Sequence, residues 1–183
     1  MHYIRILEDH TMYLFDGAMG TMLQKYGLTT NACPDYYNIS HPEIVQRIHR
    51  EYAEAGSEFI TTNTFGSTPL KLADYGLEDK VEAIAEAAVR NARAAGPHIK
   101  VAGDIGPTGQ FIKPLGTLSF DEAASNFYRL AKALTDAGAD YLIIETVIDI
   151  QEMRAALIAA HEASNLPVIC QMKIGRASCR ERV

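Results

Sequence analysis

The sequence predicts an α/β protein whose parallel strands form part of a (β/α)8 TIM barrel, with about five of the eight βα units present. Strand-like apolar runs alternate with amphipathic helical segments along the chain. This alternation predicts a parallel sheet, because parallel neighbours need a long crossover connection, usually a helix. A doubly wound nucleotide-binding sheet is the competing architecture. It is disfavoured because "GAMG" lacks the G-x-G-x-x-G spacing and no acid ends the second strand.

Five segments read as strands because they are short apolar or β-branched runs bounded by turn residues. They lie at residues 12–16, 59–65, 100–106, 141–147 and 167–172. The second, third and fourth begin about 41 residues apart, which suits a βαβ unit with additional loop residues. The chain between these strands therefore has room for one crossover helix each.

Helical periodicity fills the intervening segments. We expect helices at residues 40–56, 77–96, 119–138 and 149–163. Two of them begin with the pattern of a capping box, in which a serine caps the first turn and a glutamate reaches back. The pairs are Ser40 with Glu43 and Ser119 with Glu122.

Composition places the chain among single globular domains, with 183 residues, 48% hydrophobic and 22% charged. A net charge of −6 argues against a nucleic-acid partner. The sequence contains neither a membrane-length apolar run nor a signal peptide, so we expect a cytoplasmic protein with no membrane partner. The cysteines form no CxxC, and we expect Cys33 on the surface and Cys170 buried in its strand.

Polar residues follow four successive strands. The strand ends read Asp16-Gly17, Thr62-Asn63-Thr64, Asp104-Ile105-Gly106 and Glu145-Thr146. In a barrel these ends meet at one mouth, which is where barrel enzymes place their chemistry. Asp16, Asn63 and Asp104 each also fit a purely structural role in a turn. A purely structural role fits Glu145 least, because an acid inside the apolar strand "LIIETV" must have a partner or a ligand.

Several segments together carry a family resemblance. They are "DGAMGTMLQKYG", "HREYAEAGSEFITTNTFGST", "GDIGPTG", "PLGTLSFDEA" and "GADYLIIETVIDIQEMRAALIAA". In this order they resemble the amino-terminal homocysteine-binding domain of cobalamin-dependent methionine synthases, within the zinc-dependent homocysteine S-methyltransferase family. The resemblance covers roughly residues 12–172.

The resemblance implies a cradle for the amino acid head of homocysteine. It assigns substrate binding to Asp16, Gly17 and Glu145, to the backbone amides of Ala18, Met19 and Gly20, and less directly to Asn63, Asp104 and Gly106 as lining residues. The chemistry agrees with this assignment. An ammonium group needs carboxylates, and a carboxylate is well served by amides at the start of a helix.

The implied reaction is transfer of a methyl group to the sulfur of homocysteine, which gives methionine. In the family, zinc held by three cysteines activates the thiol, and methylcobalamin supplies the methyl group. Cobalamin- and folate-binding modules would be the partners, with 5-methyltetrahydrofolate recharging the cobalamin. The alternatives are a betaine- or S-methylmethionine-dependent methyltransferase, a non-catalytic homocysteine-binding module, and a parallel-sheet enzyme with another substrate.

This chain departs from the family pattern at its carboxyl end. The family's zinc cysteines follow the sixth and eighth strands, so no metal ligand or catalytic residue is assigned here. We expect residues 1–172 to be the amino-terminal part of the domain, inactive and marginally stable alone. Residues 173–183, "KIGRASCRERV", contain four of the 17 basic residues and lack apolar periodicity. They are predicted to be a non-native tail rather than a nucleic-acid-binding arm.

Overall fold

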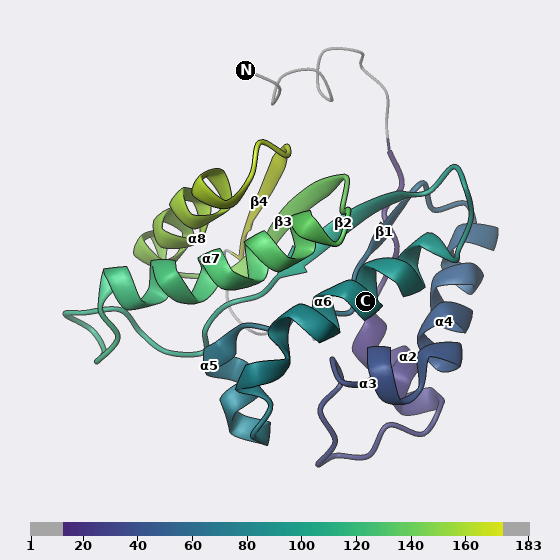
Figure 1. Cartoon of the computed structure of the whole chain (residues 1–183), viewed down its shortest axis with the longest axis horizontal. Coiled ribbons are helices and arrows are strands. Elements are labelled where there is room, and N and C mark those ends of the chain that lie inside the picture. Colours follow the sequence, from purple (N-terminus) through teal and green to yellow (C-terminus); the bar gives the residue numbers. More distant parts are fainter. Residues whose placement is uncertain (1–12, 174–183) are drawn as a thin grey trace, which may run out of the picture.

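The structure, a computed structural model, describes residues 13–173. Its one sheet contains four parallel strands, β1 (Phe59–Thr61), β2 (Lys100–Ile105), β3 (Tyr141–Val147) and β4 (Val168–Met172). Their spatial order follows the chain order without reversal (Figure 1). A sheet of this kind winds in one direction, as in a barrel, and has no switch point of the doubly wound type. The predicted α/β class and partial barrel are confirmed.

Two predicted strands differ from the structure by more than one residue. Within the described part of segment 12–16, pairing is limited to one parallel bridge between Phe15 and Phe59. The predicted strand 59–65 ends at Thr61, because the hydroxyls that follow bond across to β2. The Thr62 hydroxyl accepts from Asp104 N at 2.9 Å, and the Thr64 hydroxyl donates to Asp104 O at 2.7 Å. The chain thus turns across the end of β2 instead of continuing the ladder.

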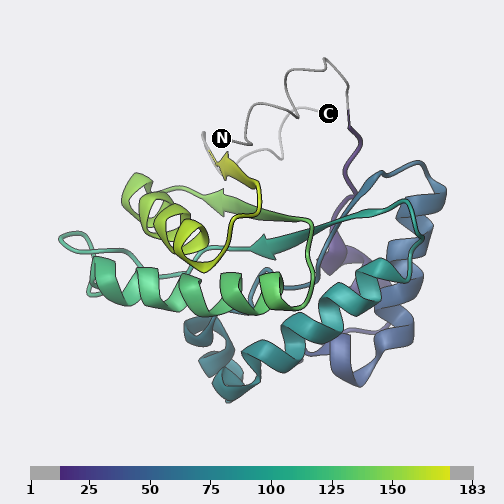
Figure 2. The ribbon, with the colours of Figure 1, turned by 45° about the horizontal axis from the view of Figure 1, so that its top comes forward.

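The crossover helices lie on one face of the sheet. The helices are α2 (Met19–Lys25), α3 (Tyr37–Ser40), α4 (Pro42–Glu54), α5 (Pro69–Leu72), α6 (Val81–Arg93), α7 (Phe120–Asp136) and α8 (Ile150–Ala163), with 3-10 turns at Ala73–Tyr75 and Glu78–Lys80. Figures 1 and 2 show α6, α7 and α8 packed side by side against the strands. This placement leaves the other face of the sheet without a layer of crossover helices.

The main core fills the space between this helical layer and the sheet. It contains fully buried side chains from both layers, among them Ile84, Val101, Ile105, Phe127, Leu130, Leu134, Leu142, Ile144 and Val147. Gly103 of β2 permits the closest contact, since a Cβ there would lie 3.1 Å from Leu134 Cβ. A smaller cluster of Leu23, Tyr37, Val45 and Ile48 joins α2, α3 and α4.

One of the two predicted capping boxes is present. Glu122 N donates to the Ser119 hydroxyl at 3.2 Å, and Ser119 N donates to the Glu122 carboxylate at 2.9 Å. The prediction for Ser40 is wrong, because α4 begins at Pro42 after His41 and has no side-chain cap. Ser40 is instead the last residue of α3, and its hydroxyl donates to Tyr36 O at 3.2 Å.

Replacing Ser119 with alanine should lower the free energy of unfolding by about 1 kcal/mol, because it removes an acceptor for the first turn of α7. Ser40→Ala is the matched control and should change it by less than about 0.5 kcal/mol. Urea denaturation of both variants measures the difference. Equal losses would show that Ser40 stabilises the chain as much as a true cap does.

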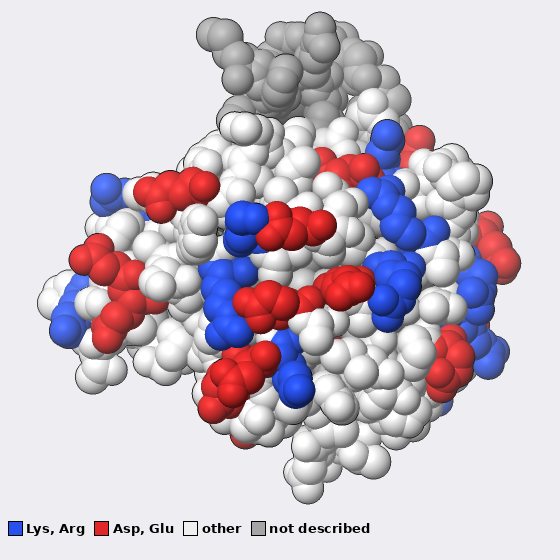
Figure 3. Space-filling view, in the orientation of Figure 1, with Lys and Arg blue, Asp and Glu red and all other residues white. Residues whose placement is uncertain are grey.

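Charged side chains of both signs intermingle over the helical face shown in Figure 3. This pattern is that of a solvated surface rather than of a basic strip for nucleic acid. Among residues 13–173, none of the helices has the length and apolar character of a membrane span. The predicted tail at 173–183 lies, apart from Lys173, outside the described residues, and its origin stays a prediction.

Candidate functional site

A cavity of about 680 Å³ opens at the carboxyl ends of the strands. The structure brings eight of the nine predicted site residues to it. They are Asp16, Gly17, Ala18, Met19, Gly20, Asn63, Asp104 and Glu145. The residues come from the turn after the Phe15 bridge and from the ends of β1, β2 and β3. The strand-end pattern of the sequence thus corresponds to one concave surface, although the role of each residue stays a prediction.

Asp16 directly follows the Phe15 bridge, and Thr61 of β1 holds its carboxylate in place. Thr61 N donates to Asp16 Oδ2 at 3.0 Å, and the Thr61 hydroxyl donates to Asp16 Oδ1. Burial raises the pKa of Asp16 to about 6, although these hydrogen bonds act to lower it. The carboxylate is therefore fixed in place and poorly solvated, so that a cation in the cavity would find it pre-oriented.

Glu145 enters the cavity at an irregularity in β3. The pairing register with β4 shifts between Ile144 and Val147, and Thr146 has a φ of 62°. A left-handed backbone is a strained conformation for a β-branched residue, at a cost of about 1–3 kcal/mol. Such bulges re-aim side chains beside binding sites. Burial raises the pKa of Glu145, and no protein hydrogen bond to its carboxylate occurs within residues 13–173.

Asp104 lies at the end of β2, between these two acids in strand order, and is almost fully buried. Burial and then the charge of Glu145 raise the pKa of Asp104 well above its ordinary value. Asp35 and Asp16 add smaller effects in the same direction. The cavity therefore concentrates acidic groups that disfavour one another's ionised forms and that a cation would stabilise.

The turn at residues 17–20 supplies backbone donors. Helix α2 begins at Met19, and its N-cap residue Ala18 makes no side-chain capping bond. Its first amides are therefore without a side-chain acceptor. Tyr52 of α4 holds the turn from behind, since its hydroxyl donates to Ala18 O at 3.1 Å. A Cβ on Gly17 would lie 2.9 Å from that hydroxyl oxygen, so glycine permits this close approach.

Asn63 lines the cavity but is used to hold a loop. Its side-chain amide donates to Pro34 O at 2.8 Å, and its backbone carbonyl accepts from the Asn38 side chain at 2.7 Å. These bonds fasten the segment after β1 to the segment before α3. Asn63 thus positions the cavity wall, and one of the two N–H donors of its side chain is already occupied.

Gly106 is the one predicted site residue that does not line the cavity. A Cβ at this position would lie 2.4 Å from Phe65 O. Glycine is therefore needed here for the close packing of two loops. The observed contact explains the residue without any contact to a ligand.

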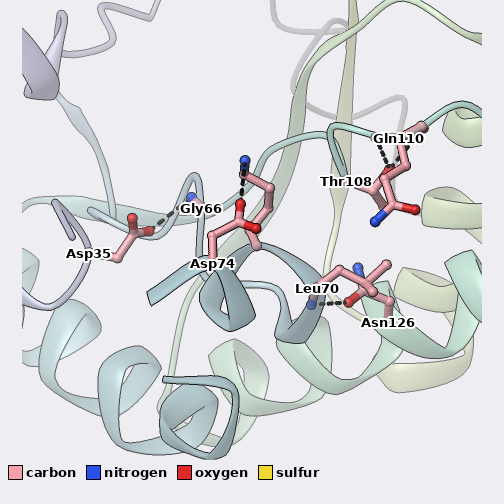
Figure 4. A network of polar contacts seen from close by, with 8 residues as sticks. Asp35, Gly66, Leu70, Asp74, Thr108, Gln110 and Asn126 are labelled. Atoms are coloured by element: carbon pink, nitrogen blue, oxygen red, sulfur yellow. Dashed lines mark hydrogen bonds and ion pairs between the residues drawn. The ribbon is translucent and has the colours of Figure 1, made fainter. Parts of the chain in front are cut away.

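The prediction from sequence missed other residues of the cavity wall, chiefly Asp35, Thr61, Lys71, Tyr75 and Thr146. Asp35 is buried, and its Oδ1 accepts from Gly66 N at 2.9 Å and from the Ser67 hydroxyl at 2.7 Å. Figure 4 shows the Asp35 bond to the Gly66 loop. Asp35 follows no strand, so the strand-end pattern contained no signal for it.

Lys71 of α5 is the single basic side chain among the residues that line the cavity. Its Nζ lies 3.4 Å from the Asp74 carboxylate. One lysine faces four carboxyl groups, those of Asp16, Asp35, Asp104 and Glu145. The arrangement suits a zwitterionic ligand whose positive group lies among the acids.

The described residues do not fit a zinc site. Within residues 13–173 no group of three or more His, Cys, Asp or Glu side chains is arranged to hold a metal ion, and no cysteine lines the cavity. The predicted positions of the two cysteines are wrong. Cys33 is buried in the main core, where burial raises its pKa, whereas Cys170 is exposed because β4 is an edge strand. A thiol with a raised pKa is not an activated thiolate.

Comparison with known proteins gives the family context. The sequence model for homocysteine S-methyltransferases matches residues 13–182. The methionine synthases of Mycobacterium leprae and Mycobacterium tuberculosis are 31% and 30% identical over 161 residues, which cover 81% of this chain. The chain spans 13% of the length of these relatives.

Solved structures of a shorter protein match the fold. The oxidized form of the homocysteine methyltransferase MmuM from Escherichia coli superposes with a TM-score of 0.78 and 26% identity, over 92% of this chain and 64% of that one. Its metallated form gives a TM-score of 0.76 and 25% identity, over 96% and 67%. The described sheet and helices therefore correspond to part of that larger domain.

Proposed function

Because the chain belongs to the homocysteine S-methyltransferase family, we propose that its cavity binds the amino acid head of homocysteine for methyl transfer to sulfur. One observation supports this proposal above the others. Two carboxylates from different strand ends, Asp16 and Glu145, share a cavity with the open start of α2. An α-amino acid carries one ammonium and one carboxylate, which these two kinds of group complement.

The residues of this chain would act by binding and orientation. Glu145 and Asp16 would receive the ammonium group, and the amides of Met19 and Gly20 would receive the carboxylate. Thr61 would keep Asp16 in one orientation through its two bonds. Fixing the amino acid head at two points restricts where the sulfur lies, and such positioning lowers the barrier for transfer.

We further propose the methionine synthase type of reaction, in which methylcobalamin is the methyl donor and modules outside this chain bind cobalamin and folate. The identity with two methionine synthases supports this assignment. The zinc ligands would likewise lie outside residues 13–173, and no step is assigned to zinc here. By itself the chain would bind homocysteine without turnover. We also propose that the protein is located in the cytoplasm.

A donor other than methylcobalamin is the second candidate. The structural match to MmuM supports it, since that protein is a homocysteine methyltransferase of which this chain covers about two thirds. An enzyme that uses betaine or S-methylmethionine would need the same cradle for the amino acid head. The two candidate functions would therefore use the residues described here in the same way. They would differ in the parts of the protein that bind the methyl donor.

A calorimetric titration tests the binding proposal. The purified 183-residue chain is titrated with L-homocysteine in the presence of a reducing agent. We expect saturable binding that EDTA leaves unchanged, because no metal-holding cluster occurs within the described residues. Absence of binding at millimolar ligand would contradict the proposal. Binding that EDTA abolishes would show that a metal ion takes part.

A further inference from the structure

Asp104 has a buried oxygen without a protein partner. The residue is 5% exposed and lines the cavity, and its Oδ1 accepts no hydrogen bond within residues 13–173. Buried polar atoms almost always have partners, because an unpaired one loses its hydration without compensation. The unpaired oxygen is thus available to a donor that enters the cavity.

The other acids of the cavity differ in what they can still accept. Both oxygens of Asp16 accept from Thr61, and Asp35 Oδ1 accepts from Gly66 and Ser67. Asp35 is therefore committed to the loop after β1. Asp104 and Glu145 both line the cavity, and each has a carboxylate oxygen that accepts no hydrogen bond from residues 13–173. An ammonium group carries three N–H donors in different directions, so two carboxylates do not exhaust it.

We propose that Asp104 is a third carboxylate for the α-ammonium group, beside Asp16 and Glu145, and selects ligands that carry this group. The inference rests on the proposed function, because homocysteine is the ligand considered there. It adds a specificity determinant at the end of β2. A ligand with the same carboxylate and thiol but no amino group would gain nothing from Asp104.

Proton release is a consequence of this assignment. The titratable side chains that line the same cavity are Asp16, Asp35, Lys71, Tyr75 and Glu145. Burial and the three acids raise the pKa of Asp104 well above its ordinary value, so the empty cavity favours its protonated form. An adjacent ammonium stabilises the carboxylate and lowers that pKa. Binding should therefore release a proton and strengthen as pH rises toward the pKa of the free Asp104.

Calorimetry on the 183-residue chain tests the proposal with L-homocysteine and with 4-mercaptobutanoate, which lacks the amino group. Asp104→Asn should weaken L-homocysteine binding about tenfold or more, since a charge-assisted hydrogen bond is lost. It should leave 4-mercaptobutanoate binding unchanged. Asp136→Asn makes the same chemical change on the exposed side of α7 and should alter neither affinity.

Repeating the titrations in two buffers of different ionisation enthalpy counts the protons. Over the pH range in which the unmodified chain releases protons on binding L-homocysteine, both Asp104→Asn and Asp104→Ser should release fewer. Equal weakening for both ligands, or equal proton release by the unmodified chain and the two Asp104 variants, would overturn the role of Asp104. Unmodified chain that fails to bind L-homocysteine would overturn the proposed function itself, which is a different result.

Discussion

The Glu145→Gln variant is expected to lose about 100-fold in affinity for L-homocysteine, because the ammonium group loses a full negative charge. Glu145 has no hydrogen-bond partner within residues 13–173, so its charge is available to a ligand. Glutamine keeps the size and one acceptor oxygen. The loss therefore measures charge rather than shape, and calorimetry of the two proteins side by side gives its size.

Measuring thermal stability distinguishes the loss of charge in Glu145→Gln from misfolding of the variant. Since burial raises the pKa of Glu145, the ionised form is disfavoured in the folded chain, and removing the charge should leave the thermal midpoint unchanged or higher. Glu86→Gln, on the exposed surface of α6, is the matched control for both measurements. An affinity unchanged in Glu145→Gln would remove Glu145 from the proposed cradle.

The Gly106→Ala variant is expected to lower the free energy of unfolding by about 1–3 kcal/mol through overpacking. The added Cβ would lie 2.4 Å from Phe65 O and 2.7 Å from Phe65 Cδ2. A carbonyl oxygen belongs to the backbone, so the loop after β1 must move rather than a side chain rotate. Urea denaturation gives the change, and the displaced loop should also weaken homocysteine binding.

Gly20→Ala is the control with the opposite expected sign. Gly20 lies inside α2, its added Cβ would meet no atom within 4 Å, and it has no positive φ. Alanine there should stabilise the chain by up to about 1 kcal/mol through helix propensity. Equal stability of the Gly106→Ala variant and the unmodified chain would mean that the loop at Phe65 yields without cost.

The prediction from sequence was most successful where a pattern reports on burial. The four strands of the sheet, the helices between them and the capping box at Ser119 follow from apolar periodicity and local hydrogen bonding. The convergence of Asp16, Asp104 and Glu145 follows from the same reasoning, because parallel strands bring their carboxyl ends to one edge.

The errors have a common cause, which is that burial and capping depend on neighbours distant in sequence. Ser40 has a capping sequence but is taken up by α3. Cys33 lies in a polar stretch yet packs into the main core, and Cys170 lies in an apolar strand yet is exposed at its edge. None of these outcomes is encoded within one turn or one strand.

Local sequence patterns were sufficient to predict the order of strands and helices, the family, and the acids at the strand ends. How these acids affect one another became clear only from the folded arrangement. The bulge at Thr146, the Thr61 bonds to Asp16, the unpaired oxygen of Asp104 and the approach of Asp35 and Lys71 all join separate elements. Electrostatic and packing energies depend on distance in space, and the folded chain sets those distances.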